Sequence, residues 1–171
     1  MPKLKIFIIG FMGSGKTYWG KRLSEKINLP FFDLDELIEQ HGNESVDEII
    51  STKGETYFRS VEKKTLENFT KNSSAFILST GGGTPCFLNN IEYLKKNGYV
   101  ICFNAEIEIL YQRLKMEKQK RPLIKNLNDK QLKDFIVEKL VERNIFYQQA
   151  DQIINEKEID LENICKILEH E

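Results

Sequence analysis

The segment from residue 10 to residue 17 reads GFMGSGKT and matches the pattern G-x-x-x-x-G-K-S/T at every fixed position. Glycines in this pattern allow a tight turn whose backbone N–H groups approach an anion at the start of a helix. Lys16 would supply a point charge to the β- and γ-phosphates of a nucleotide, and the Thr17 hydroxyl would ligate Mg²⁺. The motif predicts nucleotide binding, but many kinases and NTPases share it. The nucleotide contacts expected here are Gly13, Ser14, Gly15, Lys16, Thr17 and Tyr18.

Two carboxylates, Asp33 and Asp35, follow the second predicted strand. Residues two apart in a strand project to the same side, so both would emerge near the carboxyl end of the sheet, where α/β enzymes bind ligands. One would support Mg²⁺ through water, and the other would accept a hydrogen bond from the hydroxyl of a second substrate and would be placed to take its proton. A plain helix N-cap is the alternative, because Asp35 stands before the helix-like segment 36–38.

Three successive glycines, Gly81, Gly82 and Gly83, follow the third predicted strand. They leave backbone N–H groups unobstructed, so we expect them to approach a polar ligand; a flexible turn is the alternative. The aspartate that usually ends this strand in P-loop proteins is missing. Ser79 stands in its place and would contact Mg²⁺ only weakly, through water.

Three arginines stand near these motifs: Arg59, Arg121 and Arg143. The arginine fork suits a planar carboxylate, and Glu62 lies three residues after Arg59, within reach on one helix face. A single arginine is more often a solvated surface residue, so the inference depends on the set. Arg121 lies in the basic segment 117–128, which suits either a plain surface loop or a mobile lid over phosphates.

Short apolar runs alternate with helical patterns along the chain, which indicates a doubly wound α/β domain. We expect a three-layer α/β/α P-loop fold with a central five-stranded parallel sheet, in one domain over residues 1–171. The expected strands are 4–9, 29–32, 75–78, 99–103 and 152–154. The expected helices are 16–26, 54–68, 87–96, 106–115, 129–149 and 161–169.

The bulk properties are those of a globular protein with a small-molecule ligand. The 171 residues carry a net charge of −1, which argues against a general nucleic-acid partner. The three cysteines form no CxxC pair, so we expect free thiols in a reducing compartment. No apolar stretch approaches the roughly 20 residues that a membrane span needs, and no signal peptide is recognisable, so we expect a cytoplasmic enzyme and no membrane partner.

Taken together, these motifs resemble the shikimate kinase family over nearly the whole chain. They come in the family's order: GFMGSGKT, DLD, FRSVE, STGGG, RPL and ERNIFYQQA. The resemblance implies transfer of the γ-phosphoryl group of ATP to the 3-hydroxyl of shikimate, with Mg²⁺, on the route to chorismate. It also implies a helical substrate-binding subdomain at about 34–65 and a lid at about 114–128. We further expect a monomer.

The resemblance also implies roles for individual residues. Asp33 would lie on the Mg²⁺ side with Thr17, and Arg113 would pack near the adenine. Gly81, Gly82 and Gly83 would line the shikimate site. The residues that would bind the shikimate hydroxyls and carboxylate are Asp35, Arg59 and Arg143. The catalytic residues would be Lys16, Asp35 and Arg121, the last as the lid arginine that neutralises the transferred group.

The chain departs from the family in two places. The segment 155–159 lacks the Arg and Pro with which many members hold adenine, and Ile50 stands where an aromatic residue is common. Two other functions stay open from the sequence. One is another small-molecule kinase, such as a gluconate or nucleoside-monophosphate kinase. The other is a nucleotide-binding regulatory module, against which the presence of Lys16, Asp35 and Arg121 argues.

Overall fold

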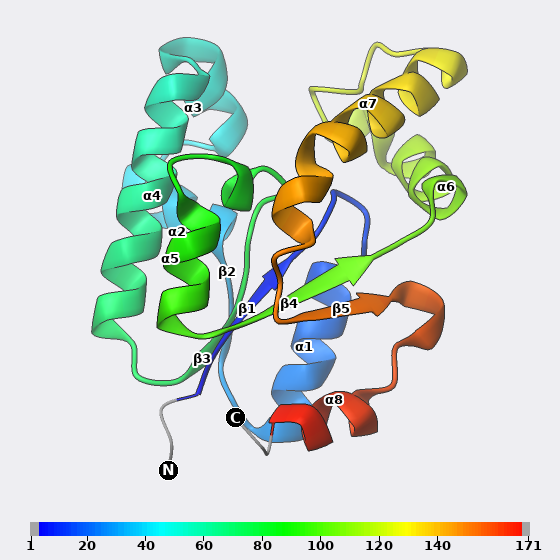
Figure 1. The fold of residues 1–171 in the computed structure, drawn as a ribbon. Coiled ribbons are helices and arrows are strands. Elements are labelled where there is room, and N and C mark those ends of the chain that lie inside the picture. The colour runs from blue at the N-terminus through cyan, green and yellow to red at the C-terminus, as the bar shows by residue number, and fades with distance from the viewer. Residues whose placement is uncertain (1–3, 169–171) are drawn as a thin grey trace.

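A five-stranded parallel sheet forms the centre of the computed structural model, which describes residues 4–168 (Figure 1). The strands are β1 (Lys5–Ile9), β2 (Phe31–Asp33), β3 (Phe76–Ser79), β4 (Tyr99–Asn104) and β5 (Gln152–Asn155). Their order is β2-β3-β1-β4-β5, so β1 is central and pairs with β3 and β4. The strand order reverses beside β1, and the loop after it therefore lies where open α/β sheets bind ligands.

Eight α-helices surround the sheet within the described residues. They are α1 (Lys16–Ile27), α2 (Leu34–Gly42), α3 (Val46–Lys53), α4 (Glu55–Asn72), α5 (Asn90–Asn97), α6 (Ile107–Glu117), α7 (Asp129–Tyr147) and α8 (Leu161–Leu168). Short 3₁₀ helices occupy Thr84–Cys86, Lys118–Lys120 and Glu156–Glu158. In Figure 1, α3 and the top of α4 lie on one side of the molecule, and α6 and α7 lie on the other.

Two apolar cores pack on opposite faces of the sheet. Along β1, Phe7 and Ile9 belong to the core shared with helices α2 to α7, whereas Ile6 and Ile8 belong to the core shared with α1 and α8. This alternation follows from the two-residue period of a strand. Because all four side chains are fully buried, the sheet is covered on both faces, and the predicted three-layer fold is confirmed.

Polar side chains fix the starts of several helices. At α3, Ser45 Oγ accepts a hydrogen bond from the Glu48 N–H, and the Glu48 carboxylate accepts one from the Ser45 N–H, which is a capping box. Asn128 and Gln131 form the same arrangement at the start of α7. The first cap fixes the start of α3 inside the expected subdomain, and the second fixes the point where the expected lid segment ends and α7 begins.

The predicted strands differ from the observed ones by at most two residues at either end. The largest error at a helix end is in α4, which runs to Asn72 rather than to residue 68. The largest error at a helix start is in α5, which begins at Asn90 rather than at residue 87. Thr84–Cys86 form a 3₁₀ helix, and Leu88 and Asn89 have φ angles of 51° and 57°, which a continuous helix does not allow. The sequence patterns predict no distinct helices at the positions of α2 and α3, which lie within the expected helical subdomain. Residue 169, the expected end of the last helix, lies outside the described residues.

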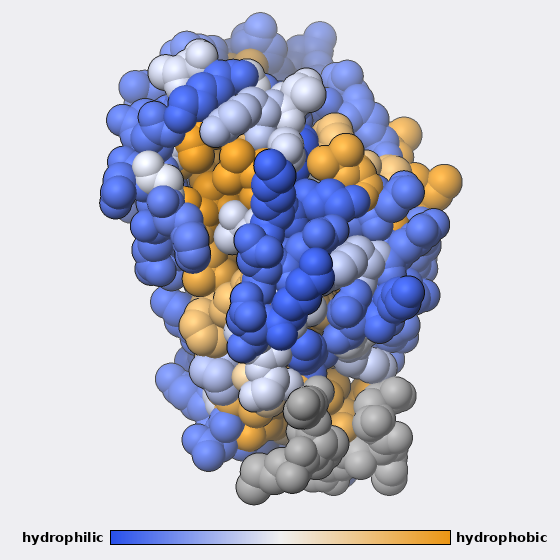
Figure 2. All heavy atoms as spheres, turned by 90° about the vertical axis from the view of Figure 1, so that its left-hand side faces the viewer, coloured by the Kyte–Doolittle hydropathy of each residue, from blue (hydrophilic) through white to orange (hydrophobic). Residues whose placement is uncertain are grey.

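Figure 2 views the molecule from the side of α3 and α4, where hydrophilic side chains cover most of the surface around a band of apolar ones. Within residues 4–168 no disulfide joins the three cysteines: Cys102 is buried, and Cys86 and Cys165 are partly buried. Among residues 4–168, no helix combines the length and the apolar character needed to cross a membrane.

Candidate active site

The loop between β1 and α1 is shaped to receive phosphates. At Gly10, where φ is 142°, an added Cβ would lie only 2.4 Å from the carbonyl oxygen of Phe103, so a side chain does not fit. Gly15, with φ of 90°, is the N-cap of α1. Lys16 Nζ donates hydrogen bonds to the carbonyl oxygens of Gly10 at 2.8 Å and Phe11 at 2.9 Å. The lysine is thus held along the loop at the amino end of the helix, where an anion is stabilised.

A cavity of ≈ 660 Å³ opens over this loop. Most of the residues predicted to contact the nucleotide line it: Gly13, Gly15, Lys16, Thr17, Tyr18, Arg113 and Arg121. Ser14 is the exception, because its side chain is fully buried. Its Oγ has no hydrogen-bond partner among the described residues. The cavity is large enough for a ligand of nucleotide size.

Oxygen atoms of the kind that divalent cations bind lie together at one wall of this cavity. Thr17 Oγ1 donates to Asp33 Oδ2 at 3.4 Å, which joins the P-loop to the end of β2. Ser79 pairs with Asp33 in the sheet register, and its buried Oγ has no partner in the part of the chain that is described. A hydroxyl and a carboxylate beside a phosphate site fit Mg²⁺, which takes one or two carboxylates together with phosphate oxygens. Within residues 4–168, no group of three or more His, Cys, Asp or Glu side chains forms a cage for a metal ion.

The sequence pattern predicts that Asp33 and Asp35 lie two apart in one strand, and this prediction is wrong. β2 ends at Asp33, and Asp35 lies in the first turn of α2. The helix begins there because the Asp33 side chain is the N-cap and accepts a hydrogen bond from the Asp35 N–H at 3.0 Å. The residue suggested as a cap, Asp35, is therefore not the cap, although both carboxylates do line the cavity.

Burial brings the pKa values of Lys16 and Asp35 towards neutrality. Desolvation lowers the pKa of the Lys16 ammonium to about 8, against the opposing effect of the Asp35 and Asp33 charges. Desolvation also raises the pKa of the Asp35 carboxyl to about 7; the charges of Asp33 and Glu62 add to the rise, and that of Lys16 opposes it. A carboxyl whose pKa lies near the working pH is suited to accept a proton from a substrate.

A second cavity of ≈ 290 Å³ adjoins the first. The residues that line both are Met12, Asp35, Gly81, Gly82 and Arg121. The second cavity is also lined by the other predicted substrate residues: Arg59, Gly83 and Arg143. Asp35 and Arg121 thus stand at the junction, where a group passing from a ligand in one cavity to a ligand in the other would be.

Arg59 is held by the ion pair predicted from the sequence. Its Nη1 donates to the Glu62 carboxylate at 2.9 Å, and Glu62 is completely buried. Thr84 Oγ1 donates to the same carboxylate at 2.7 Å, and Arg59 Nη2 lies 3.2 Å from Glu55. Because a buried carboxylate needs partners, this network fixes the arginine fork on α4.

Arg143 approaches the second cavity from α7. Its guanidinium carbon lies 5.6 Å from the centre of the Phe11 ring, and its Nη1 would lie 3.2 Å from a Cβ added to Gly82. Tyr147, one turn further along α7, donates from its hydroxyl to the Gly82 carbonyl oxygen at 2.6 Å. The glycine segment is therefore held against α7, with Arg143 beside it.

Comparison with known proteins agrees with this geometry. The model of the shikimate kinase family matches residues 12–170. A shikimate kinase of Flavobacterium psychrophilum is 44% identical over 169 residues, which cover 96% of this chain and 98% of that protein. The chain belongs to the shikimate kinase family. Members of the family are ATP-dependent kinases of aromatic amino acid biosynthesis, so the chain is an enzyme of that class.

Solved structures of shikimate kinases share the fold. The crystal structure of the Bacteroides thetaiotaomicron enzyme superposes with a TM-score of 0.91 at 36% identity, over 97% of this chain and 98% of that one. The Acinetobacter baumannii shikimate kinase, solved in complex with shikimate, has a TM-score of 0.84 at 29% identity, over 98% of this chain and 92% of that one. The P-loop fold predicted from the sequence is thus confirmed by both the sheet topology and these relatives.

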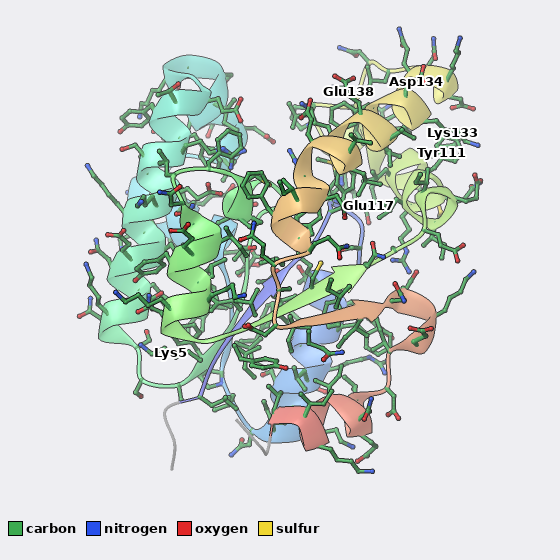
Figure 3. The ribbon with its side chains drawn as sticks, viewed as in Figure 1. Lys5, Tyr111, Glu117, Lys133, Asp134 and Glu138 are labelled. Carbon is green, nitrogen blue, oxygen red and sulfur yellow. The ribbon has the colours of Figure 1, made fainter. Side chains whose placement is uncertain are left out.

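The two arginines predicted to contact the nucleotide, Arg113 and Arg121, are each paired with an acidic residue. The resemblance to shikimate kinases did not indicate these two acidic residues. Glu117, labelled in Figure 3, accepts from Arg121 Nε at 3.0 Å and from Nη2 at 2.6 Å. Glu156 pairs with Arg113, whose Nη1 also donates to the Gly13 carbonyl oxygen at 2.9 Å. The spacing of four residues between Glu117 and Arg121 is a helical signal that the sequence contains. Glu156 gives no such signal, because it meets Arg113 only in the fold.

The expected lid segment, at about 114–128, begins with the last turn of α6. After α6 ends at Glu117, a 3₁₀ helix and turns lead to α7 at Asp129. Leu123 is 63% exposed, whereas its neighbour Ile124 is fully buried and anchors the segment. α6 and α7 also meet where Lys133 Nζ lies 4.5 Å from the centre of the Tyr111 ring, as Figure 3 illustrates.

Proposed function

We propose that this protein transfers the γ-phosphoryl group of ATP to the 3-hydroxyl of shikimate, giving shikimate 3-phosphate and ADP on the route to chorismate. The observation that carries the proposal is that Asp35 and Arg121 line both the P-loop cavity and the adjoining smaller one. A donor and an acceptor bound in these cavities would react at their junction. Membership of the shikimate kinase family supports the choice of acceptor.

In this proposal, the reaction proceeds by in-line displacement. Asp35 accepts a hydrogen bond from the attacking 3-hydroxyl and then its proton, for which a pKa of about 7 suits it. Lys16 and Arg121 offset negative charge on the transferred group. Arg121 is paired with Glu117 in this structure, so closure of the segment 114–128 would redirect its fork towards the phosphates and exclude water.

Thr17 and Asp33 would hold Mg²⁺, with Ser79 nearby. The ion would neutralise charge on the β- and γ-phosphates when it is bound. The support for this part is the contact between the Thr17 hydroxyl and the Asp33 carboxylate at the wall of the P-loop cavity.

Arg59 and Arg143 would bind the shikimate carboxylate, and Gly81, Gly82 and Gly83 would line the same site. Support comes from the position of all five residues on the smaller cavity and from the buried Glu62, which orients the Arg59 fork. The Acinetobacter baumannii relative was solved with shikimate bound, which makes the same ligand a reasonable occupant here.

Arg113 would pack against the adenine, with Tyr18 on the same cavity wall. The segment 155–159 lacks the Arg and Pro with which many relatives hold adenine. Glu156 would partly compensate, because its ion pair holds the Arg113 guanidinium beside the P-loop, where the adenine would bind. A monomeric state and a cytoplasmic location remain predictions from the sequence.

A continuous assay of ADP release with ATP and Mg²⁺ tests the proposal. The acceptors are shikimate, quinate, gluconate and AMP. We expect shikimate alone to stimulate ADP release strongly. Stimulation by gluconate or AMP instead would contradict the acceptor assignment, and ATP binding without stimulation by any acceptor would contradict the assignment as an active kinase.

A further inference from the structure

The guanidinium group of Arg59 is enclosed by aromatic rings as well as by carboxylates. Its central carbon lies 4.2 Å from the centre of the Phe87 ring and 5.0 Å from that of Phe58. The Arg59 side chain is only 13% exposed, with Glu55 and Glu62 at its edges. The carboxylates hold the nitrogen atoms of the fork, whereas the Phe87 ring limits the movement of the group as a whole.

The position of Phe87 is fixed by an unusual backbone. Leu88 and Asn89 follow it directly, and both have positive φ angles, 51° and 57°. A leucine in this conformation is strained, and such strain persists only where surrounding contacts maintain it. Phe87 itself is 38% exposed, so it is not part of the buried core, and its ring lies against Arg59 at the surface.

Two hydrogen bonds maintain this backbone. Lys63, one helical turn after Arg59 on α4, donates from Nζ to the Leu88 carbonyl oxygen at 2.6 Å. The Asn90 side chain donates to the Thr84 carbonyl oxygen at 3.0 Å. Since the Thr84 hydroxyl binds Glu62, the segment that carries Phe87 is tied at both ends to the helix that carries Arg59.

We propose that Phe87 is a positioning residue for recognition of the acceptor carboxylate: its ring holds the Arg59 guanidinium towards the smaller cavity. The inference rests on the proposed function, in which Arg59 binds that carboxylate. Phe87 does not line the cavity and so does not touch the acceptor. It acts by restricting Arg59, which lowers the conformational entropy lost when the carboxylate binds.

Substitution of Phe87 distinguishes its ring from its bulk. Phe87→Leu should raise KM for shikimate about two- to tenfold, as expected for loss of one cation–π contact, with kcat and KM for ATP unchanged. Phe87→Trp should keep the wild-type KM, because indole also presents a π face. Tyr57→Leu is the matched control. Tyr57 is an exposed aromatic residue on α4, the helix that carries Arg59, but its ring faces Lys53, whose Nζ is 5.5 Å from the ring centre. Loss of the Tyr57 ring should therefore change none of these constants.

A double-mutant cycle with Arg59→Ala completes the test. If Phe87 acts through Arg59, Phe87→Leu should cause no further loss of kcat/KM for shikimate in the Arg59→Ala background. An unchanged KM in Phe87→Leu, an equal rise in Phe87→Trp, or full additivity with Arg59→Ala would each overturn the inference. Failure of the proposed function is recognised separately, because the wild-type protein would then not phosphorylate shikimate at all.

Discussion

The Asp33 carboxylate accepts a hydrogen bond from the backbone N–H of Asp35 at 3.0 Å, so one aspartate sets the position of the other. The same carboxylate faces the Thr17 hydroxyl through its second oxygen. Asp33 therefore links the start of α2, the end of β2 and the P-loop. In the proposed mechanism Asp35 meets the acceptor and Asp33 serves the metal, so the two carboxylates would have different tasks although they are two residues apart.

This arrangement predicts that Asp33→Asn separates metal binding from folding. Asn caps helices about as well as Asp, so the melting temperature should stay near that of the wild type. The loss of the negative charge should raise the Mg²⁺ concentration that gives half-maximal activity by about 10- to 100-fold. Asp33→Ala should show the same kinetic change and in addition a lower melting temperature. An unchanged Mg²⁺ requirement in Asp33→Asn would exclude Asp33 from the metal site.

The pKa shifts of Asp35 and Lys16 predict a narrow pH optimum. Asp35 is active as the carboxylate, so kcat/KM should fall as the pH drops through about 7; Lys16 is active as the ammonium, so kcat/KM should fall as the pH rises through about 8. Asp35→Asn should lower kcat by about 10²- to 10⁴-fold and remove the acidic limb, with ATP affinity retained. An acidic limb that persists in Asp35→Asn would assign it to another group.

Gly83 predicts a steric test of the acceptor site. A Cβ there would lie 2.5 Å from Arg59 Nη2, so Gly83→Ala must displace the arginine fork. We expect kcat/KM for shikimate to fall about ten- to hundredfold, with KM for ATP unchanged. Gly42→Ala is the control, because no atom lies within 4 Å of its added Cβ. Equal changes of kcat/KM in Gly83→Ala and Gly42→Ala would show that acceptor binding does not depend on the present position of the Arg59 fork.

The pair Arg113 and Glu156 predicts non-additive effects on ATP binding. Arg113→Ala should raise KM for ATP about tenfold, since it removes the proposed contact with the base and leaves the Glu156 carboxylate without its Arg113 partner in the nucleotide cavity. Adding Glu156→Ala should recover part of the loss. Glu158→Ala is the matched control, as Glu158 binds only Asn155 among the contacts observed in residues 4–168. Strict additivity in steady-state kinetics would contradict the proposed link.

The sequence predicts those parts of the structure that are determined locally. The P-loop motif, its flanking strand and helix, and the ion pair between Arg59 and Glu62 all depend on residues close together in the chain, and all are present. The spacing of Asp33 and Asp35 was misread because a helix cap, rather than strand alternation, sets their geometry. Where a short strand runs directly into a helix, the boundary covers only two or three residues, so the sequence does not show which of them is the cap.

Contacts between distant segments were beyond sequence reasoning. Tyr147 binds the Gly82 carbonyl across 65 residues, and Glu156 meets Arg113 across 43. The start of α5 was misplaced because Lys63, from another helix, holds the backbone of Leu88 in a conformation that leucine rarely adopts. In each case tertiary packing decides the local structure, and no short pattern encodes it.

The position of the transferred phosphate tests the central claim most directly. The wild-type protein should be incubated with ATP, Mg²⁺ and shikimate, and the product examined by ³¹P–¹H correlation NMR. The account predicts one phosphate ester, coupled to the proton on carbon 3 of shikimate and formed in equal amount to ADP. Free inorganic phosphate without an ester, or an ester at another hydroxyl, would contradict it.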